Sequence, residues 1–89
     1  MGDRGQVLIE DTGVYLYTHW GGTELKKNVA KALDRGISRW DDAPYLTRII
    51  FCDMVRDDFD SITGEGISNK SMSPDHAQIN INIKNQTVT

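Results

Sequence analysis

The sequence predicts an α+β fold with the element order β-β-α-α-β-β and an antiparallel sheet of about four strands. Three observations predict it. Two runs rich in β-branched and aromatic residues stand near the start of the chain, a stretch with helical periodicity follows, and a late segment alternates isoleucine with polar residues. This order places two helices together on one face of the sheet.

The first two runs, residues 6–10 and 14–18, read as the strands of a β-hairpin. The residues between them, Asp11-Thr12-Gly13, have the composition of a tight turn. A short loop that contains glycine between two such runs is typical of an antiparallel hairpin.

Residues 24–35 predict the first helix, because their apolar residues recur at helical spacing. These residues are Leu25, Val29, Ala32 and Leu33. We expect Thr23 to cap the start of this helix and Gly36 to close it in a left-handed conformation. The opposite face carries Lys27, Lys31 and Arg35, four residues apart, and such a stripe is usually solvated.

A second helix is predicted over residues 45–58, with Asp42 as its N-cap and Pro44 in its first turn. The competing interpretation is a strand over residues 48–52, which the local β-propensity favours. The proline at the start and the length of the apolar stretch favour the helix.

Two more strands are predicted, a short one over residues 66–69 and a longer one over residues 78–84. In the longer segment Ile79, Ile81 and Ile83 alternate with amides and a lysine, the pattern of a half-buried antiparallel strand. We expect one domain spanning residues 1–89, with residues 1–5 fraying and residues 85–89 either fraying or extending the last strand.

Size and composition exclude several classes of function. A net charge of -3 argues against general nucleic-acid binding. Because Cys52 is the one cysteine, neither an intrachain disulfide nor a zinc site of several thiolates can form. The sequence shows no signal peptide and no membrane-spanning run, so we expect a cytoplasmic protein. A chain of 89 residues has a modest core, which favours a homo-oligomer.

The glycine corner, residues 19–23, is the predicted ligand site. It lies between a strand and a helix, where backbone N–H groups are expected to be free to meet an anion. Aromatic rings and a guanidinium would add base stacking and phosphate contacts, so we expect a nucleotide-like anionic ligand. The alternative interpretation is a tight corner with tryptophans that fill the core. The predicted ligand-binding residues are His19, Trp20, Gly21, Gly22, Thr23, Arg39 and Trp40.

Signals for chemistry are weak. A stretch that begins at Asp57 superficially resembles a calcium loop, but Ile62 and Thr63 stand where a ligand and a glycine are needed. No serine has the context of a nucleophile elbow. We therefore predict no catalytic residues, no metal and no cofactor. The alternative is a small hydrolase that uses His19 with Asp41 or Asp42.

Four segments are similar to a family of small proteins encoded by bacteria and their phages. They are Tyr15-Leu16-Tyr17-Thr18-His19-Trp20-Gly21-Gly22, Arg35-Gly36 with Arg39-Trp40-Asp41-Asp42, Tyr45-Leu46 with Arg48-Ile49-Ile50-Phe51, and Thr63-Gly64 with Gly66-Ile67-Ser68. The resemblance covers residues 7–88. No activity is attached to this family, so it implies no catalytic residues; it implies a small accessory protein.

Two further functions therefore compete with the hydrolase. The first is a non-enzymatic module that sequesters a nucleotide-like ligand at the glycine corner, as a phage accessory protein would. The second is a protein-interaction module that inhibits a host factor through the Lys27, Lys31 and Arg35 stripe or through the acidic loop of residues 57–65.

Overall fold

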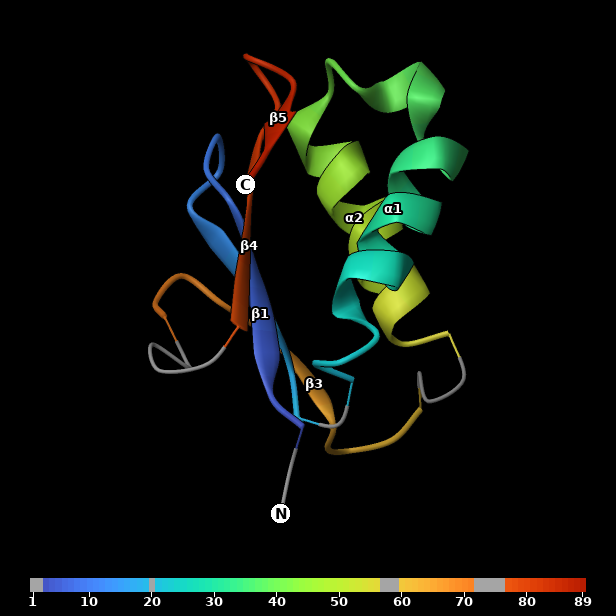
Figure 1. Cartoon of the computed structure of the whole chain (residues 1–89), viewed down its shortest axis with the longest axis vertical. Helices are drawn as coiled ribbons and strands as arrows, with labels where there is room; N and C mark the ends of the chain where they lie inside the picture. Colours follow the sequence, from blue (N-terminus) through green and yellow to red (C-terminus); the bar gives the residue numbers. More distant parts are fainter. Residues whose placement is uncertain (1–2, 20, 57–59, 72–76) are drawn as a thin grey trace.

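The computed structural model describes residues 3–19, 21–56, 60–71 and 77–89. Two α-helices and a short 3-10 turn pack on one face of a five-stranded sheet (Figure 1). The strands are β1 (Gly5–Ile9), β2 (Val14–Thr18), β3 (Glu65–Ser68), β4 (Ala77–Asn82) and β5 (Thr87–Val88). The helices are α1 (Leu25–Arg35) and α2 (Ala43–Met54), joined through η1 (Ile37–Arg39). The predicted α+β class is confirmed.

The sheet is mixed, with strand order β3-β2-β1-β4-β5. The predicted hairpin of β1 and β2 is confirmed, and β2–β3 and β4–β5 are also antiparallel. The central pair, β1 and β4, is parallel. The prediction of a purely antiparallel sheet of about four strands is therefore wrong in strand number and in this one pair. The reason is that β3 and β4, although close in sequence, do not pair with each other but lie on opposite sides of the β1–β2 hairpin.

The tail does not extend the last strand, because it turns back as β5. Gln86 N donates to Ile83 O across the turn (3.2 Å), and Ile81 then pairs with Val88. The N-terminal end also joins the sheet, since Asp3 N donates to His19 O at 2.7 Å just before β1 begins at Gly5. Both ends of the described chain are therefore held by backbone hydrogen bonds.

The core lies between the sheet and the two helices. The register places Val7 of β1 between Leu16 of β2 and Ile79 of β4, so one face of the three strands is apolar. The predicted alternation of β4 and the predicted apolar face of α1 both point into this layer. Buried core residues are Val7, Ile9, Leu16, Leu25, Val29, Ala32, Leu46, Ile50, Ile79, Ile81 and Ile83.

The predicted N-cap of α1 is wrong, and Gly36 is the C-cap as predicted but without the predicted left-handed conformation. The N-cap is Glu24, which makes no side-chain cap bond, while Thr23 N donates to the carboxylate of Asp3. Gly36 has φ -94°, outside the left-handed region. A Cβ at Gly36 would come within 2.9 Å of Leu46 Cδ1 and 3.2 Å of Ala32 O. The glycine is therefore there to let the two helices approach closely.

Helix α2 has the predicted N-cap, but it begins at Ala43, two residues before the predicted range of 45–58, and it ends sooner. Asp42 is its N-cap, and its Oδ1 accepts a hydrogen bond from Tyr45 N at 3.4 Å. The helix ends at Met54 rather than at residue 58, and residues 57–59 lie outside the described part of the chain. Because residues 48–52 are helical, the competing strand interpretation is wrong.

An ion-pair cluster ties the two helices together. The side chain of Asp53, only 4% exposed, lies 2.7 Å from Arg56 Nη2 and 3.6 Å from Arg35 Nη2. Arg35 also donates from Nη2 to Ile49 O on α2 (3.1 Å). A buried carboxylate needs such partners, because leaving its charge unpaired costs several kcal/mol, of order 3–5.

Asp11 joins the first hairpin to the last one. Its Oδ1 accepts from Ile83 N at 2.6 Å and its Oδ2 accepts from Lys84 N at 3.0 Å. The hydrogen bond from Ile83 N holds the pKa of Asp11 below its ordinary value, because it stabilises the ionised carboxylate. The ionised form of Asp11 therefore stabilises the fold.

We expect Asp11→Asn to lower stability at pH 7 and to weaken the dependence of stability on acid pH. A carboxyl whose pKa is lowered by folding stabilises above its unfolded pKa of about 4, and this contribution is lost as pH falls through the folded value. Urea unfolding at pH 7 and pH 3 measures both effects. Asp60→Asn is the matched control, because Asp60 is exposed. Equal pH dependence in the wild type and Asp11→Asn would contradict the assignment.

Candidate binding site

In the glycine corner the backbone amides of Gly21, Gly22 and Thr23 are already bonded within the chain. Gly21 N donates to Thr18 Oγ1 at 3.0 Å, and Gly22 N donates to Asp3 O at 2.7 Å. Thr23 N donates to Asp3 Oδ2 at 2.8 Å. The expectation that these amides are free to meet an anion is therefore wrong.

Asp3 also places a negative charge at the corner. The hydrogen bonds from the Thr23 hydroxyl and backbone lower the pKa of Asp3, so this carboxyl is ionised at neutral pH. An incoming anion would meet a carboxylate where the sequence suggests free donors. The corner thus lacks the free N–H donors on which the prediction of phosphate binding depends.

Gly22 is needed for a close approach of the chain to itself. A Cβ at this position would lie 2.5 Å from Arg4 O and 2.8 Å from Asp3 O. Both atoms are backbone oxygens that cannot move aside as a side chain can. The alternative interpretation of the glycines, a tight corner of the fold, accounts for this residue.

The remaining predicted residues fall into two separate groups. His19 stays at the corner, where its Nδ1 lies 3.0 Å from the Tyr17 hydroxyl, and Trp20 lies outside the described residues. Arg39 and Trp40 follow the other end of α1 (Figure 1). A helix of 11 residues is about 16 Å long. The six predicted residues that the structure describes therefore fall at opposite ends of α1.

The same distance separates the residues of the hydrolase alternative. Asp42 lies beyond the far end of α1 from His19, and it is engaged by Arg39 at 3.8 Å and by Tyr45 N. Asp41 is exposed at that same end. Neither aspartate is placed to orient the imidazole, so the geometry gives no support to this pair.

Arg39 is also occupied by its own neighbours. Its guanidinium carbon lies 4.9 Å from the centroid of the Tyr45 ring, in addition to the Asp42 contact. A cation over an aromatic face gains about 0.5–1 kcal/mol at an exposed site. Arg39 thus fixes the turn between η1 and α2.

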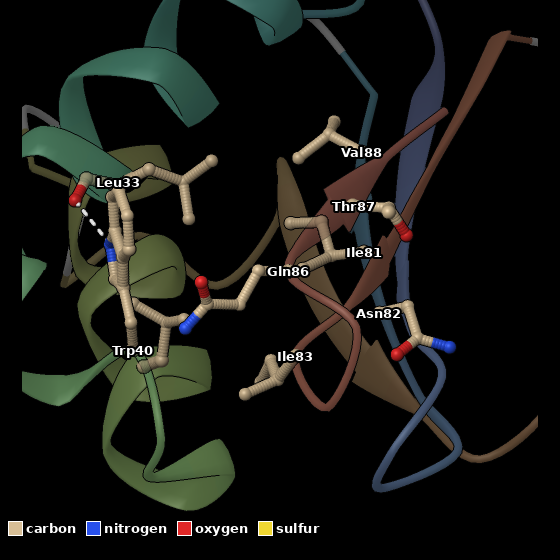
Figure 2. A pocket seen from close by; sticks show the side chains of 9 residues that line it. Leu33, Trp40, Ile81, Asn82, Ile83, Gln86, Thr87 and Val88 are labelled. Atoms are coloured by element: carbon tan, nitrogen blue, oxygen red, sulfur yellow. Dashed lines mark hydrogen bonds between the residues drawn. The ribbon is translucent and has the colours of Figure 1, made fainter.

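Trp40 forms one wall of an apolar hollow, which we call the indole slot (Figure 2). Its Nε1 donates to Leu33 O at 2.9 Å, which fixes the ring against the end of α1. The β4–β5 hairpin forms the opposite wall, and the slot holds about 90 Å³. The lining residues are Leu33, Trp40, Leu46, Ile81, Asn82, Ile83, Gln86, Thr87 and Val88.

Gln86 stands at this slot in a strained conformation. Its φ is 54°, and its side chain extends from the hairpin toward Trp40 (Figure 2). The β1–β2 hairpin has a positive φ of 71° at the corresponding last loop position, where the residue is Gly13. A non-glycine residue in this region costs of order 1 kcal/mol or more, and such strain often marks functional positions.

Sequence reasoning found Trp40 but missed the rest of the slot. The sequence predicts Leu33 on the apolar face of a helix and Ile81 and Ile83 on the buried face of a strand. The structure confirms both positions. The slot residues Gln86, Thr87 and Val88 belong to a tail for which no turn was predicted. No local pattern links these segments, because only the sheet pairing brings them together.

The basic stripe of α1 and the acidic loop of residues 57–65 are the other two surfaces that the sequence predicts. In the basic stripe Arg35 is bound to α2, while Lys27 and Lys31 are exposed and form no ion pair with described residues. Residues 57–59 of the acidic loop lie outside the described part. Within the described ranges no group of three metal-ligating side chains comes together, and no described helix is long and apolar enough to cross a membrane.

Three comparisons with known proteins found no similar protein. No protein-family model matches the sequence, and neither the curated proteins nor the solved structures gave a match. The resemblance to a family of bacteria and their phages therefore stays a prediction. What the molecule binds has to be inferred from its own geometry.

We expect Gly22→Ala to destabilise the protein by about 1–3 kcal/mol, because the new methyl group meets two backbone oxygens. Gly21→Ala is the matched control, since its Cβ would meet only the Thr18 hydroxyl, at 3.0 Å. Urea denaturation measures both free energies of unfolding. Equal stability of Gly22→Ala and the wild type would show that the N-terminal segment does not pack on the corner.

Proposed function

We propose that the protein is a non-enzymatic module that binds another protein by anchoring one aliphatic side chain of that partner in the indole slot. The observation that carries the proposal is the slot itself, an apolar hollow with a fixed indole wall and a strained glutamine beside it. Apolar pockets beside tryptophan are typical anchor points of protein interfaces.

The size of the slot favours a side chain over a small molecule. Pockets for drug-sized ligands or cofactors usually hold about 300–1,000 Å³. The indole slot holds about 90 Å³, less than the ~150 Å³ of a cavity that binds benzene. A nucleotide does not fit, whereas the end of a leucine, isoleucine or valine side chain has a suitable size.

The surroundings of the slot are suited to an interface. Val88, which lines it, is 50% exposed, and Ile37 and Tyr45 are 58% and 54% exposed on the adjacent η1 and start of α2. Trp40 itself is 37% exposed. Aromatic side chains are enriched at interfaces, and the buried centre of an interface is more apolar than the rest of the protein surface. Gln86 adds an amide that can hydrogen-bond the partner backbone.

The proposal moves the binding site from the glycine corner to the indole slot. Of the residues predicted to bind a ligand, it retains Trp40. Sequestration of a nucleotide-like ligand loses support because the corner amides are bonded to Thr18 and Asp3. Inhibition of a host factor is one form that protein binding would take. That role, the cytoplasmic location and the homo-oligomer remain predictions.

The test is a selection of displayed random peptides on the immobilised protein. We expect enriched peptides to share one aliphatic residue, and their Kd, measured by fluorescence anisotropy, to rise at least about tenfold in Trp40→Ala. Val88→Phe should have the same effect, because its ring fills the slot from the hairpin side. Circular dichroism confirms that each variant is folded.

Ile62→Ala is the matched control, because Ile62 is 99% exposed and does not line the slot. Its Kd should equal that of the wild type. The absence of any enriched peptide, or an unchanged Kd in folded Trp40→Ala and Val88→Phe, would overturn the proposed function.

A further inference from the structure

A second hollow runs beside the indole slot, and we call it the α1–β4 groove. It holds about 600 Å³ and shares Leu33 and Val88 with the slot, so the two are neighbours. Its floor is apolar, since Val29 is 3% and Ile79 is 7% exposed. The lining residues are Lys26, Val29, Ala30, Leu33, Gln78, Ile79, Val88 and Thr89.

Part of β4 forms an open sheet edge along this groove. Strand β5 pairs with Ile81 and Asn82, and Thr89 exchanges two hydrogen bonds with Asn80, each of 2.9 Å. No described residue pairs with the segment 77–79 on this side of β4 (Figure 1). Half of the length of β4 is therefore left for an added chain.

The hydrogen-bond pattern shows which backbone groups point outward. Asn80 uses both its N–H and its C=O toward the β5 side, whereas Ile81 O accepts from Glu10 N on the β1 side. Peptide groups alternate in direction along a strand, so Gln78 directs its N–H and C=O to the same side as Asn80. Gln78 thus offers one donor and one acceptor at the open edge.

The wall above this edge carries one basic side chain, Lys26 of α1, which lines the groove. The other basic residues of α1, Lys27, Lys31 and Arg35, are not among the lining residues, and Arg35 is paired with Asp53. Neither Lys26 nor its neighbours Lys27 and Lys31 form an ion pair with a described residue. The charge of Lys26 is complementary to a partner that carries carboxylates.

We infer that the α1–β4 groove binds an extended acidic segment of the partner protein. The segment adds as a strand at Gln78, turns an apolar side chain toward Val29 and Ile79, and presents carboxylates to Lys26. Strand addition of this kind derives affinity from main-chain bonds and specificity from alternate side chains. The inference rests on the proposed function, because it describes how the partner continues beyond the residue in the indole slot.

A second copy of this chain fits the same edge poorly. Two identical β4 edges paired about a two-fold axis would bring Lys26 of both copies toward one groove. Like charges placed opposite each other destabilise strand pairing. An acidic segment gains from the same lysine, so the observations favour it over self-association.

The experiment uses a capped seven-residue peptide in which every second residue, on the face turned to α1, is valine or glutamate, and the residues between them are threonine. We expect it to bind the wild-type protein, measured by fluorescence anisotropy, and to slow hydrogen exchange of the Gln78 amide about tenfold or more, measured by NMR. Two peptides are matched to it: one replaces every glutamate by lysine, and one is N-methylated at alternate backbone nitrogens. Both should bind at least about tenfold more weakly, the first through repulsion and the second through lost hydrogen bonds.

Lys26→Glu in the protein should weaken binding of the acidic peptide at least about tenfold. Lys70→Glu is the matched control, because Lys70 is exposed and does not line the groove, and it should leave the Kd unchanged. No binding at millimolar peptide, an unprotected Gln78 amide, or equal binding to Lys26→Glu would overturn the inference. If the Gln78 amide becomes protected from exchange as the protein concentration rises, without any peptide, the edge pairs with a second copy of the chain and the inference is overturned.

The two proposals can fail separately. If selected peptides depend on Trp40 while the Gln78 amide exchanges freely, the groove is excluded and the proposed function stands. If selected peptides are indifferent to Trp40 and Val88, the proposed function fails whatever the Gln78 amide does.

Discussion

The structure depends on the requirement that the backbone of β1 be paired on both sides. Val7 and Ile9 are 0% exposed, so the peptide groups of this strand have no access to water. A buried N–H or C=O left without a partner costs about 1–3 kcal/mol. Strand β2 supplies one side through a short hairpin, and β4 supplies the other, more than 60 residues later in sequence. The chain that connects β2 to β4 therefore has to pack over or around the sheet.

The binding surface follows from how β4 meets that requirement. Because β4 runs parallel to β1 and its isoleucines face the helices, the next turn brings β5 back on the outer side of β4. That strand has two residues, so it covers one half of β4 and leaves the other half open. The indole slot lies where the β4–β5 hairpin meets Trp40. The α1–β4 groove lies beyond the point where β5 ends. Both hollows therefore result from one short strand.

The glycine corner shows how a local signal can have two physical causes. Glycine allows a ligand to approach the backbone, and it equally allows another part of the same chain to do so. Here the approaching group is the backbone at Asp3 and Arg4, and the Asp3 carboxylate takes the place expected for an anion. Asp3 is 20 residues from Thr23, and no pattern in the sequence indicates that the two meet.

Local sequence patterns predict the features that depend on neighbours along the chain. The β1–β2 hairpin, the apolar face of α1, the Asp42 cap with its proline and the alternation of β4 all express periods or turns of a few residues. Four other features appear only in the folded chain: the order of strands, the parallel β1–β4 pair, the return of β5 and the separation of His19 from Trp40 by the length of α1. These depend on contacts between distant segments, where the burial of β1 and the close packing of the helices at Gly36 select one arrangement among several that satisfy the same local preferences.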